Sequence, residues 1–119
     1  MDDRYLFKMT DCMGNIVVLK KLTFENKIRK DHPEIPIQVI KDIVEHTHLI
    51  NIDELPNRYD YYKIIINPTP NSNDFIFAKA VLEKTESGYC EVVTSYLKRK
   101  LTDEVNRGVI YDAGTKNWC

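Results

Sequence analysis

The sequence predicts an α+β domain in which an N-terminal hairpin and two helices pack on a four- to five-stranded antiparallel sheet. Two β-prone runs flank a glycine turn near the N-terminus, an apolar helical repeat follows, and three further β-prone runs come later. Short turn-forming segments separate these later runs, whereas parallel neighbours need crossovers of about a dozen residues or more. We therefore expect an antiparallel meander. At 119 residues, the chain is expected to form one domain with a core of ordinary size.

The first two strands are expected at residues 5–9 and 15–19. They surround Asp11-Cys12-Met13-Gly14, where Gly14 can adopt a positive φ and close a hairpin.

Two helices should follow the hairpin. Thr23 is a suitable N-cap for a helix over residues 23–30, and Pro33 disfavours helical geometry at His32. His32 is therefore expected at the helix end or in the loop beyond it. Pro36 suits the first turn of a second helix over residues 37–45. Its apolar residues recur at helical spacing at Ile37, Ile40, Ile43 and Val44.

The rest of the chain reads mainly as strands. The expected strands cover residues 49–52, 61–66, 75–82 and 89–96, with dense turn formers between them. Residues 101–107 could form a helical turn and residues 108–111 a last extended piece. Residues 112–119 are expected to be a loosely ordered tail.

Composition limits the function classes. The formal net charge is −1, so a nucleic acid would be held locally and not by a generally basic surface. No apolar run is long enough to span a bilayer, and no signal peptide is evident. The three cysteines form no CxxC pair and no metal-ligand spacing, which favours reduced thiols in a cytoplasmic protein. We predict no metal site and no cofactor.

A basic stretch ends in the first candidate catalytic residue. Between residues 20 and 30 there are five basic residues and one acid, and His32 follows directly. A lone loop histidine is most often a solvated side chain, but cations beside a phosphate stabilise the charge that develops in a transition state. We predict that His32 and Lys30 take part in catalysis and that Lys27 and Arg29 bind substrate.

A second candidate set lies on the last strand of the meander, at Thr94-Ser95-Tyr96. Side chains alternate along a strand, so Thr94 and Tyr96 share a face, where a hydroxyl and a phenol could bind phosphate and stack a base. Thr and Tyr are also ordinary strand formers, so this signal is weak alone. We assign Thr94 and Tyr96 to catalysis and Ser95 to substrate binding.

Three more residues are candidates for substrate binding. Lys79 lies among apolar residues of a strand, where it either extends to an edge or points into a ligand site. Tyr62 belongs to an aromatic run that could stack on unpaired bases or pack in the core. Arg99 is the centre of a short basic run directly after the last strand of the meander.

The order of these pieces resembles the Barnase–EndoU–colicin–RelE-like nuclease superfamily, especially its phage-associated and colicin-D-like branches. The resemblance covers residues 20–100 and depends on three patches: 27–35, which contains His32, the helix at 37–45 with the run to residue 52, and 92–96, which contains Thr94 and Tyr96.

The resemblance implies metal-independent cleavage of RNA, with tRNA as one candidate substrate. In that chemistry a ribose 2′-hydroxyl attacks the adjacent phosphate, and a cyclic phosphate and a free 5′-hydroxyl result. His32 would be the general base or acid, and the basic residues before it would neutralise the phosphate. The second proton-transfer group stays open among Tyr96, Lys79 and Glu34. The resemblance also implies a toxin or phage-associated effector held in check by a cognate immunity or antitoxin protein.

Two other functions are compatible with the sequence. The first is a non-catalytic module that binds RNA or protein through the same surface, which suits the near-zero net charge. The second is an immunity- or antitoxin-like partner protein, which suits the acidic outer face of the second helix.

Overall fold

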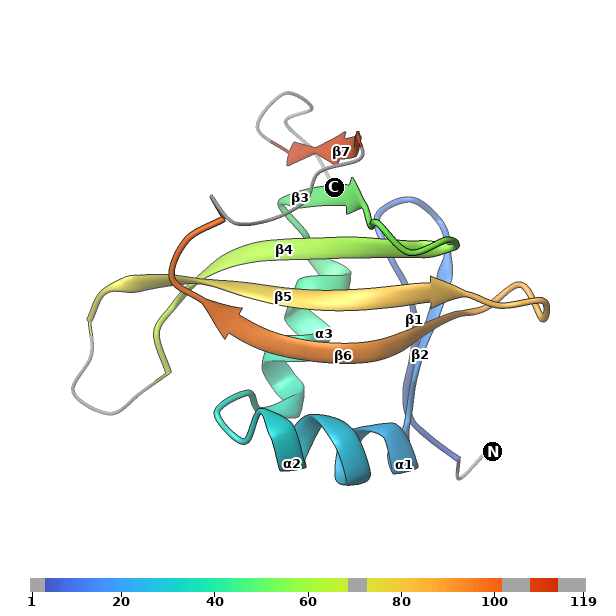
Figure 1. Cartoon of the computed structure of the whole chain (residues 1–119), viewed down its shortest axis with the longest axis horizontal. Helices are drawn as coiled ribbons and strands as arrows, with labels where there is room; N and C mark the ends of the chain where they lie inside the picture. The colour runs from blue at the N-terminus through green and yellow to red at the C-terminus, as the bar shows by residue number, and fades with distance from the viewer. Residues whose placement is uncertain (1–3, 69–72, 102–107, 114–119) are drawn as a thin grey trace.

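The computed structural model describes residues 4–68, 73–101 and 108–113. Seven strands and two helical segments make up this part of the chain (Figure 1). The strands are β1 (Tyr5–Thr10), β2 (Ile16–Lys20), β3 (Leu49–Ile52), β4 (Arg58–Ile66), β5 (Phe75–Lys84), β6 (Cys90–Lys98) and β7 (Val109–Asp112). The helical segments are a continuous run of α1 (Lys21–Thr23), η1 (Phe24–Ile28) and α2 (Arg29–Asp31), followed by α3 (Ile37–Glu45).

All seven strands belong to one mixed sheet in the order β1-β2-β6-β5-β4-β3-β7. The α+β class is confirmed, but the prediction of four to five antiparallel strands was wrong. The hairpin is part of the sheet, because β2 pairs in parallel with β6 at Val17 and Val18. The pairing of β3 with β4, β4 with β5 and β5 with β6 is antiparallel, as the meander predicted.

The first helical segment lies along the edge of β6. It begins at Lys21, two residues before the predicted cap at Thr23, and no side chain caps it. Its middle turn, η1, is a wider π-type turn that buries Phe24 and Ile28 in the core. Because β2 pairs with only the first residues of β6, this helix covers the next part of the β6 edge (Figure 1). The helix ends at His32, before Pro33, as predicted.

Helix α3 covers the other face of the meander and has the predicted bounds (Figure 1). Ile40, Ile43 and Val44 are fully buried and pack with the inward side chains of the sheet. The hairpin joins this core at its turn, where the buried Asp11 carboxylate accepts a hydrogen bond from the Tyr61 hydroxyl. Burial, together with this bond, raises the pKa of the Tyr61 phenol. One face of β4 and β5 therefore packs on α3 while β6 contacts η1, and within the described residues the opposite face of β4, β5 and β6 (the open face) carries no helix.

The last described strand, β7, pairs with β3 at the far edge of the sheet. The predicted extended piece at residues 108–111 is thus confirmed, and Asp112 belongs to the strand instead of to a loose tail. The predicted helical turn at residues 101–107 and the tail at residues 114–119 lie outside the described residues, except Leu101.

Candidate functional site

Three side chains form a row across the open face of the sheet. Lys79 on β5 is the register partner of Tyr62 on β4 and of Tyr96 on β6. Partners in register point to the same face, so an ammonium group lies between two phenol rings. The Lys79 Nζ atom is 5.6 Å from the centroid of the Tyr62 ring and 5.4 Å from that of Tyr96. This row is the base of the candidate site.

His32 extends the row beyond β6. The centroid of its imidazole ring lies 4.9 Å from that of Tyr96, and the two ring planes are 30° apart. The backbone holds the histidine at the helix end, because the His32 N–H donates to the Ile28 carbonyl at 2.7 Å. Its Nδ1 atom lies 3.7 Å from Glu34 Oε2. A residue from the early helix thus meets a late strand, as the sequence predicted.

Lys79 is buried with a partner of opposite charge. The Lys79 Nζ atom lies 3.9 Å from the Oδ2 atom of Asp60 on β4. Lys79 is only 6% exposed and Asp60 only 2%. A buried charge needs such a partner, because removal from water costs several kcal/mol per ion. Asp60 and the two ring faces therefore keep a cation on this face of the sheet.

A pocket of about 270 Å³ opens beside this row. Thr94, Tyr96, Lys79 and Val81 line one side of it, on β5 and β6. Its remaining lining residues, on β4 and in the turn before it, are charged: Asp53, Glu54, Arg58 and Asp60. Thr94 and Tyr96 share this face, so a phosphate-sized ligand near Lys79 would meet both a hydroxyl and a phenol.

The structure brings five predicted site residues together: His32, Tyr62, Lys79, Thr94 and Tyr96. Ser95 is elsewhere. It is fully buried on the opposite face of β6, and its hydroxyl donates a hydrogen bond to the Lys79 carbonyl at 2.7 Å. At that position Ser95 cannot contact a substrate, and it packs in the core instead of binding substrate as predicted.

The predicted basic residues of the helix are solvent-exposed. Lys27, Arg29 and Lys30 all lie on its surface, and the Arg29 guanidinium stands 5.2 Å from the centroid of the Phe24 ring. Arg99 is also exposed and forms an ion pair with Asp74, with an N–O distance of 3.0 Å. None of these four cations lines the 270 Å³ pocket.

Sequence reasoning missed the acidic side of the site. Asp60 is flanked by tyrosines in a strand, and an acid in such a strand interior is a usable signal of a buried ion pair. Arg58 shares its face by alternation and forms an ion pair with Glu83. His48, between α3 and β3, was also not among the predicted site residues, and it lines a second pocket, described below.

Within the described residues, no three His, Cys, Asp or Glu side chains are grouped so that they could hold a metal ion. Cys12 and Cys90 are free thiols, and burial raises the pKa of Cys90. In the same part of the chain, no helix is long and apolar enough to cross a membrane.

Comparison with protein-family models, with curated protein sequences and with solved structures finds no match for this chain.

Proposed function

We propose that this protein is a metal-independent endoribonuclease of the toxin or phage-associated effector type. The observation that carries the proposal is the contact of His32 with Tyr96, on the face of the sheet that also presents Lys79 and Thr94. Imidazole and phenol can transfer the protons, and ammonium and hydroxyl can stabilise the phosphate charge, in RNA cleavage without a metal. The resemblance to the Barnase–EndoU–colicin–RelE-like nucleases supports the same chemistry.

In the proposed reaction, the ribose 2′-oxygen forms a bond to phosphorus and the bond from phosphorus to the 5′-oxygen breaks. One of the pair His32 and Tyr96 accepts the proton of the 2′-hydroxyl, and the other gives a proton to the departing 5′-oxygen. The products are a 2′,3′-cyclic phosphate and a 5′-hydroxyl. Only RNA carries the attacking group.

Lys79 and Thr94 act on the phosphate itself. The ammonium compensates the negative charge that grows on the phosphate oxygens, and the hydroxyl donates a hydrogen bond to one of them. The exposed Lys27, Arg29 and Lys30 attract the RNA backbone to the end of the helix. We place this activity in the cytoplasm, with a cognate inhibitor protein as its control.

The test is incubation of the full chain with total tRNA in the presence of a chelator. We expect cleavage that leaves 5′-hydroxyl ends, and a loss of about 10²-fold or more in rate for His32→Ala. His46→Ala is the matched control, because His46 is exposed at the end of α3 and should be dispensable. An inactive wild-type chain, or a His32→Ala variant as active as the wild type, overturns the proposal.

A second candidate is a non-catalytic module that binds RNA. The observation in its favour is the burial of Lys79 beside Asp60. A buried pair of this kind can stabilise the fold without acting on a phosphate, so the surface could bind RNA without cleaving it. This alternative predicts binding that weakens with salt and is unchanged in His32→Ala, with no cleavage.

A further inference from the structure

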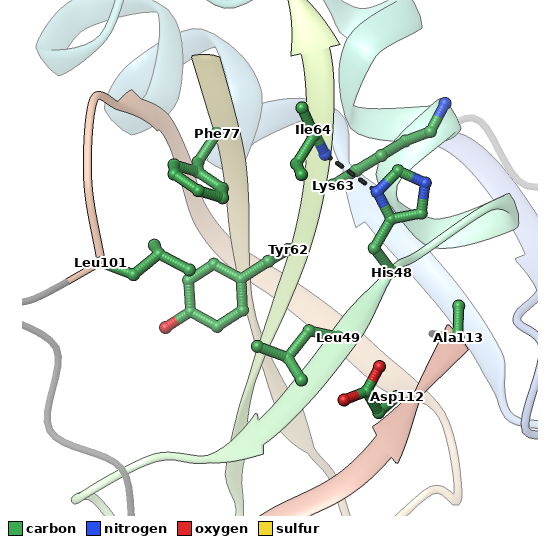
Figure 2. A pocket seen from close by; sticks show the side chains of 9 residues that line it. All are labelled: His48, Leu49, Tyr62, Lys63, Ile64, Phe77, Leu101, Asp112 and Ala113. Atoms are coloured by element: carbon green, nitrogen blue, oxygen red, sulfur yellow. Dashed lines mark hydrogen bonds between the residues drawn. The ribbon is translucent and has the colours of Figure 1, made fainter. Parts of the chain in front are cut away.

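A second pocket lies on the same open face, next to the candidate site. Its volume is about 510 Å³, a size typical of small-molecule sites. Most of its lining is apolar, and Figure 2 shows the side chains around the hollow. The lining residues are Leu49, Tyr62, Ile64, Phe77, Leu101 and Ala113, with His48, Lys63 and Asp112 as the polar members.

The pocket forms because β4 is longer than its neighbour. The pairing of β3 with β4 begins at Leu49 and Tyr62, so beyond Tyr62 no strand among the described residues pairs with β4 on the side away from β5. His48 ends the ladder at this point, since the Ile64 N–H donates to its Nδ1 atom at 3.1 Å (Figure 2). Partial desolvation of the ring, with help from Lys63, lowers the pKa of His48 although the residue is largely exposed, and this favours the neutral ring that the bond needs.

Tyr62 is the wall shared with the candidate site. Its ring lines the 510 Å³ pocket, and the ammonium of Lys79 lies 5.6 Å from its centroid. Neighbouring strands are about 4.8 Å apart, so a phosphate bound between Lys79 and Tyr96 is close to the pocket mouth. A nucleotide held by its phosphate there could place its base in this pocket, against Phe77.

The lining has the chemistry that binds a base. Phe77 on β5 is a half-buried aromatic side chain on which a base can stack, and such stacking contributes about 1–3 kcal/mol per base, whereas Tyr62 is only 2% exposed and forms the floor of the pocket. Asp112 adds a carboxylate to an otherwise mostly apolar pocket (Figure 2). A carboxylate has about four acceptor positions. Aspartate typically accepts from the exocyclic amino group of a base.

We propose that this pocket is a nucleobase subsite, which holds the base next to the scissile phosphate and prefers bases with an amino group over uracil. The proposal rests on the ribonuclease function proposed above. An apolar peptide of a partner protein is a second candidate ligand of suitable size. A nucleobase is favoured over a peptide because Tyr62 joins the pocket directly to Lys79 and Tyr96 of the candidate site.

The test measures binding of the four 3′-nucleoside monophosphates to the full chain by calorimetry. We expect at least one of 3′-CMP, 3′-GMP and 3′-AMP to bind about 10-fold more tightly than 3′-UMP. The wild type and His32→Ala should show the same preference. Phe77→Ala should weaken binding about 10-fold, in line with the loss of one stacking wall. Asp112→Asn should reduce the preference over 3′-UMP.

Phe75→Ala is the matched control, because Phe75 lies two residues from Phe77 on the same strand face but outside the pocket, and is 70% exposed. Phe75→Ala should bind the nucleotides with the same affinity as the wild type. Leu101→Ala is a second pocket variant if Phe77→Ala fails to fold, which circular dichroism will show. Equal affinity for ribose 5-phosphate and the nucleotides, or equal effects of Phe77→Ala and Phe75→Ala, overturns the subsite.

The two proposals fail separately. Nucleotide binding at this pocket without RNA cleavage contradicts the ribonuclease function and leaves the binding site in place. RNA cleavage with the same rate and sequence preference in Phe77→Ala contradicts the subsite and leaves the ribonuclease function in place. Binding of an apolar peptide that nucleotides do not displace also contradicts the subsite.

Discussion

At the scale of single residues, the account depends on what Tyr96 contributes to His32. Two roles are separable: the ring packs against the imidazole, and the hydroxyl can transfer a proton. Tyr96→Phe keeps the ring and removes only the hydroxyl, whereas Tyr96→Ala removes both.

If the phenol transfers a proton, Tyr96→Phe should lower the rate of RNA cleavage about 10²-fold without a change in melting temperature. Tyr96→Ala should be at least as damaging, because it also frees the histidine ring. Single-turnover cleavage assays measure both variants. Wild-type rates in Tyr96→Phe would assign the second proton transfer to Lys79 or Glu34 instead.

His48 gives a pH dependence of stability that does not involve catalysis. Burial and the nearby Lys63 lower its pKa below the ordinary value of 6.5, while Asp42 opposes the shift. The unfolded chain therefore binds the proton more readily than the folded one, so stability is present above about pH 6.5 and is lost as the pH falls toward the lowered folded-state pKa.

Urea denaturation between pH 7 and pH 5 tests this expectation. The wild type should lose more unfolding free energy over this range than His48→Asn, whose side-chain oxygen can accept the Ile64 N–H but does not titrate. His46→Asn is the comparison for the loss of a histidine that makes no hydrogen bond to Ile64. Parallel pH curves for the wild type and His48→Asn would show that His48 does not titrate differently on folding.

At the scale of elements, the helix before His32 is held by its buried side. Ile28 is fully buried in the core one turn before His32 and accepts the hydrogen bond from the His32 N–H. Ile28→Ala should lower the free energy of unfolding by about 2–5 kcal/mol, the usual cost of such a cavity.

Leu22→Ala in the same helical run is the control, because Leu22 is 69% exposed and should change stability by about 0.5 kcal/mol or less. Chemical denaturation measures both. An Ile28→Ala variant as stable as Leu22→Ala would contradict the packing that positions His32.

The elements were predictable where the signal is local. The period of apolar residues gave α3 its bounds, and β3 was predicted at the observed residues. The parallel pairing of β2 with β6 was not predicted, because no local pattern specifies which distant strand a hairpin will join. The same reason explains the missed pairing of β7 with β3.

The candidate site was predictable to a similar degree. Alternation placed Thr94 and Tyr96 on one face, and Pro33 placed His32 at a helix end. Asp60 and the pocket at His48 were missed, because both result from the register of β4 against its neighbours and from the end of the β3 ladder.

At the scale of the whole molecule, a net charge of −1 cannot hold RNA by general attraction. The account instead places recognition in one local region, where the end of an early helix meets the open face of β4, β5 and β6. The cation there is Lys79, and the basic residues of the helix before His32 are exposed to solvent. Specific cleavage at few positions, rather than general degradation, is the expected behaviour.

The most direct test uses a DNA oligonucleotide that contains a single ribonucleotide. If His32 and the residues of β5 and β6 act together on a phosphate beside a 2′-hydroxyl, the chain should cut only after that ribonucleotide. The product should carry a 2′,3′-cyclic phosphate, and His32→Ala should not cut. Equal cleavage of the all-DNA control would contradict this mechanism. So would a chimeric strand that stays intact under conditions where the protein cuts an all-RNA strand.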